Sequence, residues 1–136
     1  MKRVLLIIPP KNYRDEELQQ PKRVFESEGY AVTIASKGTT LATGMLGGTT
    51  PITKDIKDIV VPEYNVIVFV GGSGASEYFD DKEIHKIAKE AVKLNKIVVA
   101  ICIAPSILAN DGLLKGLKAT SFPSEKKNLE KHGAIY

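Results

Sequence analysis

Four short apolar runs, rich in β-branched residues, constrain the fold of this chain more than any other feature. The runs are Val4–Ile8, Ala31–Ala35, Val66–Val70 and Ile97–Cys102. None alternates with polar residues, which is typical of strands buried on both faces of a parallel sheet. The sequence therefore predicts a sheet with layers on both sides rather than one with a solvent-exposed face.

Helical patterns separate these runs. They cover residues 16–28, 80–94, 105–110 and 124–132, and we expect Ser124 to cap the last of them. Strands that alternate with helices indicate right-handed crossovers and a flavodoxin-like, doubly wound α/β fold with helices on both faces. The segment Lys37–Pro51, with four Gly and five Thr, departs from this rhythm and predicts a hairpin excursion or a surface loop.

The size and charge of the chain exclude several classes of protein. Its 136 residues suffice for one domain, residues 1–136, and the net charge of +3 is too small and scattered to indicate nucleic-acid binding. No apolar run approaches the ~20 residues that span a bilayer, so we expect no membrane partner. The single cysteine excludes an internal disulfide and favours a reducing, cytoplasmic location. Metal-ligand spacings are absent, so the sequence implies neither a metal nor another cofactor.

Ligands of open α/β sheets bind beyond the carboxyl ends of the strands. Cys102 lies at such an end, and Pro105 opens a helix three residues later. A thiol on this strand-to-helix turn resembles a nucleophile elbow, and the nearby helix dipole predicts a lowered thiol pKa. The alternative is a chemically inert core cysteine.

Two further loops reach the same edge of the sheet. The glycine-rich Gly71–Gly74 follows the third apolar run, where its amides could hold an oxyanion or a phosphate, or merely form a tight turn. Glu17 belongs to an acidic run that would complement a helix dipole, or its carboxyl could share a proton with Cys102. Neither histidine lies near Cys102 in the sequence, and neither is a candidate for catalysis.

Taken together, these loops resemble the ThiJ/PfpI superfamily, which includes the Parkinson-associated deglycase and the PfpI proteases and is related to class I glutamine amidotransferases. The matching segments follow the family's order along nearly the whole chain: Arg14–Leu18, Val70–Gly72, Ala100–Pro105, Gly112–Gly116 and Ala119–Pro123. The resemblance implies that Cys102 is the nucleophile and Glu17 the invariant glutamate. It also implies that the amides of Gly72 and Ile103 form the oxyanion hole.

The chain departs from the family where a histidine partner is expected. Ile103 stands where the proteases carry histidine, and Phe122 stands where the deglycase branch carries it. The resemblance implies a homodimer or larger homo-oligomer, in which Glu77 lies close to the position of a cross-subunit glutamate. The apolar run that starts at Ala134–Tyr136 leads us to expect a single domain that lacks the family's C-terminal strands and helix.

Three functions remain open at this stage. The chain could be a cysteine-dependent hydrolase or lyase acting on a peptide or a small carbonyl substrate, with slow turnover because no histidine assists. It could be a stress-related redox sensor in which Cys102 is oxidised beside Glu17. It could also be a small-molecule binder that uses Gly71–Gly74, with Cys102 inert. Within the first class, the missing histidine favours carbonyl addition over peptide cleavage.

Overall fold

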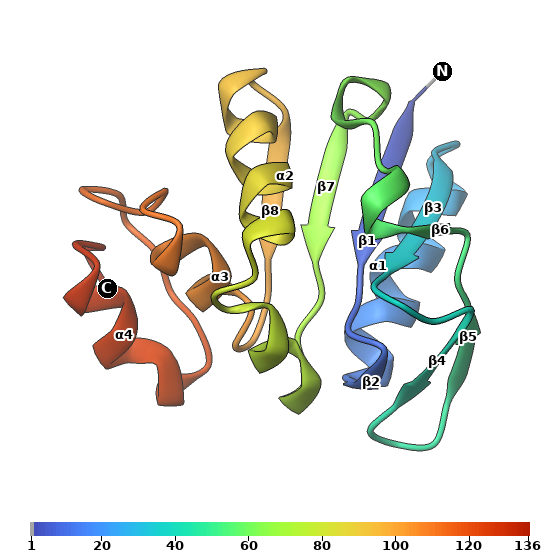
Figure 1. The fold of residues 1–136 in the computed structure, drawn as a ribbon, viewed down its shortest axis with the longest axis horizontal. Coiled ribbons are helices and arrows are strands. Elements are labelled where there is room, and N and C mark those ends of the chain that lie inside the picture. The colour runs from blue at the N-terminus through green and yellow to red at the C-terminus, as the bar shows by residue number, and fades with distance from the viewer. Residues whose placement is uncertain (1) are drawn as a thin grey trace.

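The computed structural model describes residues 2–136 and is built around a five-stranded parallel sheet (Figure 1). Its strand order is β6-β3-β1-β7-β8. All four apolar runs form strands of this sheet, so the expected fold class is confirmed. The strands are β1 (Arg3–Ile7), β3 (Ala31–Ser36), β6 (Lys54–Asp55), β7 (Val66–Phe69) and β8 (Ile97–Ala100).

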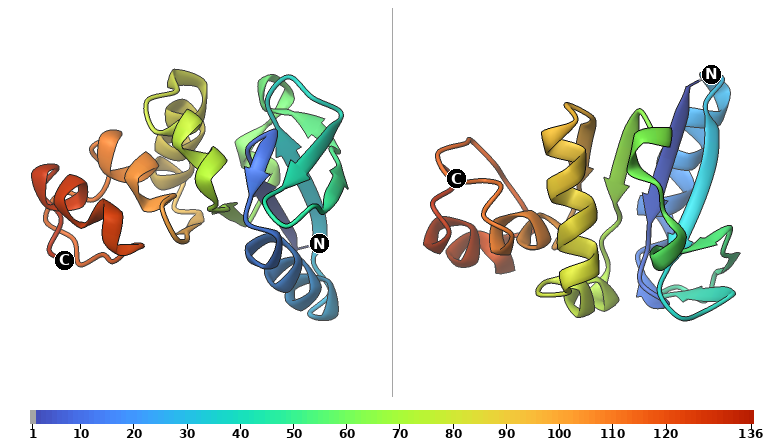
Figure 2. Two further views of the ribbon diagram at one scale, coloured as in Figure 1. Left: turned by 90° about the horizontal axis from the view of Figure 1, so that it is seen from below. Right: turned by 45° about the horizontal axis from the view of Figure 1, so that its top comes forward.

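Helices connect the strands and cover both faces of the sheet. In the left view of Figure 2, α1 and α2 lie on opposite sides of it. The α-helices are α1 (Asp15–Ser27), α2 (Lys82–Lys93), α3 (Pro105–Asn110) and α4 (Lys126–Lys131). Four short 3-10 helices accompany them: η1 (Ile56–Asp58), η2 (Val61–Glu63), η3 (Ser73–Tyr78) and η4 (Pro123–Glu125). No helix among residues 2–136 is long and apolar enough to cross a membrane.

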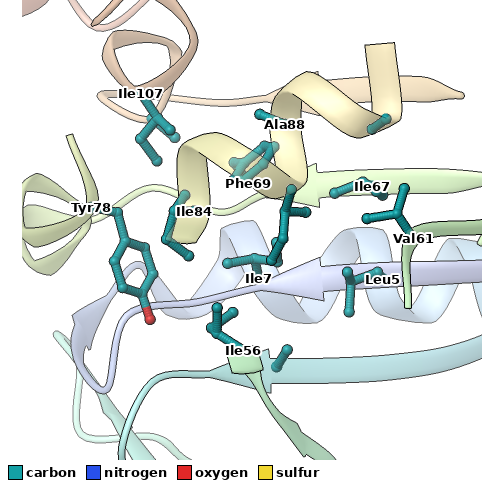
Figure 3. Close-up of a cluster of buried hydrophobic side chains, with 14 of the residues drawn as sticks. Leu5, Ile7, Ile56, Val61, Ile67, Phe69, Tyr78, Ile84, Ala88 and Ile107 are labelled. Atoms are coloured by element: carbon teal, nitrogen blue, oxygen red, sulfur yellow. The ribbon is translucent and has the colours of Figure 1, made fainter. Parts of the chain in front are cut away.

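Strand β1 contributes to two hydrophobic cores because successive side chains point to opposite faces. Leu5 and Ile7 pack with Phe69 and Ile84 on the α2 side (Figure 3). Val4, Leu6 and Ile8 pack on the α1 side with Leu18. This burial of both faces explains why the first apolar run shows no polar alternation.

The ends of the helices agree only in part with the sequence. Asp81 caps α2 by accepting hydrogen bonds from the amides of Glu83 and Ile84. Ser124 does not cap the last helix, because it lies inside η4 and its hydroxyl donates to Glu125. That cap prediction is wrong. Helix α1 continues through Pro21, which has no N–H to donate to the carbonyl four residues earlier.

The Gly- and Thr-rich segment forms the predicted hairpin, with strands β4 (Leu41–Gly44) and β5 (Thr49–Pro51). A short strand that the sequence did not indicate, β2 (Lys11–Tyr13), pairs with β4. The carboxylate of Asp15 accepts hydrogen bonds from the amides of Leu46 (2.8 Å) and Gly48 (2.9 Å). The hairpin tip is therefore held against the first turn of α1.

Edge strand β8 leaves apolar side chains uncovered on its α1 side. Ile97 is 61% exposed and Val99 is 39% exposed. Their neighbours Val98 and Ala100 point the other way and pack against the α2-side core. This edge of the sheet therefore carries an exposed apolar surface.

Candidate functional site

Cys102 occupies the turn between β8 and α3, and its backbone is left-handed with φ 63°. A non-glycine residue adopts this conformation only when its surroundings hold it there. The amide of Ala104 donates to the carbonyl of Ile101 (3.0 Å), and the amide of Phe122 donates to the carbonyl of Cys102 (2.7 Å). The strand-to-helix turn predicted for Cys102 is therefore present, and its backbone is strained.

Glu17 approaches the cysteine from the first turn of α1. Its Oε1 accepts a hydrogen bond from the amide of Gly71 (3.1 Å). Its carboxyl also lies close enough to the Cys102 thiol for a side-chain hydrogen bond to affect the pKa of both groups. The structure thus brings together two residues that are 85 positions apart, and Glu17 is more than a complement to the helix dipole.

The glycine loop after β7 makes this approach possible. A Cβ atom on Gly71 would collide with the Glu17 carboxyl and with Cβ of Cys102. Gly72 has φ 105°, a conformation that favours glycine. The amides of Gly72 and Ile103 both donate toward the Cys102 sulfur, so the two predicted oxyanion-hole residues converge on the same atom.

The electrostatics of the thiol differ from the sequence-based expectation. Burial raises the pKa of the Cys102 thiol, and the charge and hydrogen bond of Glu17 raise it further. The amides of Gly72 and Ile103 oppose this shift without reversing it. The prediction of a lowered thiol pKa is wrong because α3 has only six residues and cannot outweigh desolvation and a neighbouring carboxylate.

The carboxyl of Glu17 is itself shifted. Burial raises its pKa, while the Gly71 amide and the Cys102 thiol lower it in part. A carboxylate that ionises less readily binds a proton more strongly than an exposed one. Glu17 is therefore suited to take the thiol proton and to return it.

A cavity of about 890 Å³ opens above the thiol. One wall comes from Arg14, Glu16 and Glu17 together with Met45 at the hairpin tip. The other comes from residues 120–124, which follow α3 in the sequence and fold back against the turn at Cys102. The lining residues include Arg14, Glu16, Glu17, Met45, Gly72, Ser73, Ile101, Cys102, Ile103, Thr120, Ser121, Phe122, Pro123 and Ser124.

Several of these lining residues were not singled out from the sequence. Arg14 forms a two-point ion pair with Glu16, with Nε and Nη2 each 2.9 Å from a carboxylate oxygen. Sδ of Met45 accepts a hydrogen bond from the amide of Ser73 at 3.4 Å. No local sequence pattern predicts that Arg14, Glu16 and Met45 line the same cavity. They come together only because the β4–β5 hairpin folds back over the start of α1.

Other titratable residues lie away from the cavity. Glu77 is exposed on η3, so its predicted role across a subunit interface stays a prediction. His85 is mostly buried, with Nε2 2.7 Å from the carbonyl of Phe79 and Nδ1 3.4 Å from Oδ1 of Asp111. His132 contacts the carbonyl of Asn128 at the end of α4. Among residues 2–136, no three His, Cys, Asp or Glu side chains are grouped to hold a metal.

Comparison with known proteins identifies the family to which this site belongs. A protein of Methanocaldococcus jannaschii is 43% identical over 137 residues, which cover 98% of this chain and 67% of the relative. A deglycase of Pyrococcus abyssi is 29% identical over 92% of this chain and 75% of its own length. A solved ThiJ/PfpI domain protein of Brachyspira murdochii superimposes with a TM-score of 0.95 and 30% identity, covering 98% of this chain and 77% of that one. The DJ-1/PfpI family model matches residues 2–136, and the chain belongs to that family.

Proposed function

We propose that this protein is a cysteine-dependent enzyme that adds the Cys102 thiol to a reactive carbonyl, with methylglyoxal as a model substrate. One arrangement carries the proposal. The Glu17 carboxyl lies against the thiol, and the amides of Gly72 and Ile103 are directed at the same sulfur. The P. abyssi relative is named a deglycase, which supports carbonyl chemistry at a site of this family.

The chemistry begins with transfer of the thiol proton to Glu17 as sulfur attacks the aldehyde carbon. The new C–S bond forms while the carbonyl π electrons move to oxygen, and the two amides stabilise the developing charge. Glu17 then gives the proton to that oxygen, which completes a hemithioacetal. A raised pKa suits Glu17 to this exchange, because a stronger base removes the thiol proton more readily.

The hemithioacetal of a 2-oxoaldehyde can react further without an external oxidant. Glu17 removes the proton from the carbon bonded to sulfur, and the neighbouring carbonyl carbon is protonated through an enediol. The product is a thioester of a 2-hydroxy acid. Water cleaves the C–S bond of this thioester, which releases the acid and restores the thiol.

Peptide cleavage is less suited to this site. An amide nitrogen leaves readily only when a general acid protonates it. Ile103 and Phe122 line the cavity where family members carry histidine, and neither side chain transfers protons. We therefore place carbonyl substrates ahead of peptides.

The redox-sensor alternative is weakened by the state of the thiol. Peroxide reacts with the thiolate, and burial together with Glu17 raises the pKa of Cys102 and so reduces the thiolate population. The ligand-binding alternative is weakened by the glycine loop itself. The amide of Gly71 donates to Glu17, that of Gly72 is directed at Cys102, and that of Ser73 donates to Met45. With the amides of Gly71 and Ser73 occupied, the loop does not present the row of free amides that a phosphate site needs, and the Gly72 amide is left to meet the charge that develops beside the thiol.

The test compares three reactions of the wild type and of a Cys102→Ser variant. We expect Cys102-dependent consumption of methylglyoxal with formation of lactate, and little cleavage of unstructured peptides. A mass gain of two oxygens at Cys102 under dilute peroxide, without carbonyl turnover, would support the redox sensor instead. Rapid Cys102-dependent peptide cleavage would contradict our proposal.

A further inference from the structure

A buried serine lies one helical turn beyond the cysteine. Ser106 is fully buried in α3, and its hydroxyl donates to Oε1 of Glu125 at 2.7 Å. Nδ2 of Asn128 in turn donates to the Ser106 hydroxyl at 3.0 Å. A hydroxyl that would be costly to bury alone is thus satisfied by two side chains from a later part of the chain.

The same hydrogen bonds attach the segment after residue 120 to α3, the helix that follows Cys102. Nδ2 of Asn128 also donates to Oδ1 of Asn110, at the end of α3, at 2.8 Å. Ser124 donates to the second Glu125 oxygen at 2.8 Å. Behind these polar contacts, Ala109 of α3 packs against Leu129 of α4. Figure 1 shows the two helices side by side beyond β8.

The fastened segment is one wall of the cavity. Residues 120–124 line it, and the Phe122 amide holds the carbonyl of Cys102 at 2.7 Å. Glu125 follows this wall directly but does not line the cavity. Any effect of Glu125 on the cysteine must therefore act through the wall and through α3.

We propose that Glu125, through its hydrogen bond to Ser106, is a positioning residue that holds the wall of residues 120–124 closed over Cys102. The inference deepens the proposed function and rests on Cys102 being the reactive group. It assigns Glu125 no contact with substrate.

A carboxylate suits this role because its bond to a hydroxyl is charge-assisted and stronger than a neutral one. Its second oxygen is free to accept from Ser124, so one side chain fastens both the helix and the wall. Loss of this acceptor leaves the wall attached through the Phe122 amide, the Asn128 contacts and the hydrogen bonds between Ser121 and Tyr136. The wall should then open more often and expose the thiol to water and to larger reagents.

The experiment measures the rate at which iodoacetamide and the bulkier monobromobimane alkylate Cys102, as a function of pH. Glu125→Ala should increase the rate at neutral pH about fivefold, as expected for loss of one hydrogen bond, with a larger gain for the bulkier reagent. The pH profile should move to lower pH because the thiol becomes less buried. Glu125→Gln keeps an acceptor for Ser106 and should stay within about twofold of the wild type.

Glu130→Ala, an exposed substitution on α4, is the matched control and should match the wild type. Ser106→Ala removes the other partner and should reproduce the effect of Glu125→Ala, and the double variant should add little. If Glu125→Ala fails to fold, Ser106→Ala asks the same question. Alkylation rates and pH profiles of Glu125→Ala or Ser106→Ala that match the wild type would overturn the proposal, as would a Glu125→Gln variant as reactive as Glu125→Ala.

Carbonyl turnover provides the second measurement. A loosened wall should raise KM for methylglyoxal more than it lowers kcat, whereas general destabilisation changes neither while the protein remains folded. Alkylation requires only the thiol. A wild type that consumes no methylglyoxal would therefore refute the proposed function and leave the alkylation test of Glu125 intact.

Discussion

The carboxyl of Glu17 and the thiol of Cys102 share a contact that shifts their pKa values in opposite directions. Their hydrogen bond lowers the pKa of Glu17 and raises that of Cys102. The contact therefore favours a neutral thiol beside a carboxylate, with the proton on sulfur in the resting protein. Catalysis at such a pair needs the proton to move only when a carbonyl is present.

Glu17→Gln should separate the reactivity of the thiol from turnover. Because Glu17 raises the thiol pKa through both its charge and its hydrogen bond, its neutral replacement should lower that pKa. Alkylation of Cys102 at neutral pH should become faster, while methylglyoxal consumption should fall by ~10²-fold or more for lack of a proton acceptor. Glu28→Gln, at the exposed end of α1, is the control. An unchanged alkylation profile would remove Glu17 from the site.

Gly71→Ala should damage the site and the fold together. The new methyl group would meet Glu17, Cys102 and the carbonyl of Ile101. Overpacking of this kind costs about 1–3 kcal/mol of unfolding free energy, and displacement of either side chain should abolish turnover. Gly38→Ala is the control for loss of a glycine without overpacking, since the added Cβ meets no atom within 4 Å; the φ of 72° at Gly38 adds only a local backbone strain that Gly71 does not have. Urea unfolding and methylglyoxal assays should show loss of turnover only for Gly71→Ala.

Asp81→Ala should weaken the fold without changing the reactivity of Cys102. Asp81 accepts from two amides at the start of α2 and from Nζ of Lys37 at 2.7 Å. Burial raises its pKa, but Lys37 and the amides outweigh burial and leave it lowered. The substitution should cost about 1–2 kcal/mol at neutral pH. A carboxyl whose pKa is lower in the folded than in the unfolded protein stabilises the fold at pH values above its unfolded pKa. The cost of Asp81→Ala should therefore shrink as the pH falls through the folded pKa of Asp81.

Urea unfolding at neutral and acidic pH measures that difference directly. Asp81→Asn keeps a capping acceptor but loses the charge and the ion pair with Lys37, so its stability should lie between that of the wild type and that of Asp81→Ala. A cost for Asp81→Ala that does not change with pH would show that the charge of Asp81 contributes nothing.

The fold could be predicted because burial on both faces leaves a visible pattern. Val4–Ile8 has no polar alternation, and its side chains fill both cores. Strands β2 and β6 were not predicted because they have only three and two residues. Strands this short form through pairing with neighbouring strands rather than through local sequence preference.

The convergence of the candidate site residues could be predicted from the sequence, but their electrostatics could not. Cys102, Glu17 and Gly72 each follow a strand or open a helix, so topology alone brings them to one edge of the sheet. The thiol pKa depends on how deeply the thiol is buried and on a carboxylate 85 positions away, which no local pattern reveals. The contact of Ser106 with Glu125 was missed for the same reason, because it requires the segment after α3 to return to the elbow.

Phe122→His should give the site a second proton carrier beside Glu17. The Phe122 amide is 2.7 Å from the Cys102 carbonyl, so the side chain at this position stands at the mouth of the cavity. Relatives in the deglycase branch carry histidine here, as the resemblance implies. An imidazole that titrates near neutral pH can take the thiol proton and protonate a leaving group.

We expect the Phe122→His variant to consume methylglyoxal ~10-fold faster or more, which is part of the ~10²–10⁴-fold that general acid–base help typically provides. A new limb should appear in its pH–rate profile near the ordinary histidine pKa of about 6.5. Phe122→Leu, which removes the ring without adding a proton carrier, should stay close to the wild type. Equal rates for the two variants would mean that residue 122 cannot reach the reacting atoms. A gain in peptide cleavage by Phe122→His alone would show that a proton carrier at position 122 is sufficient for amide cleavage at this site.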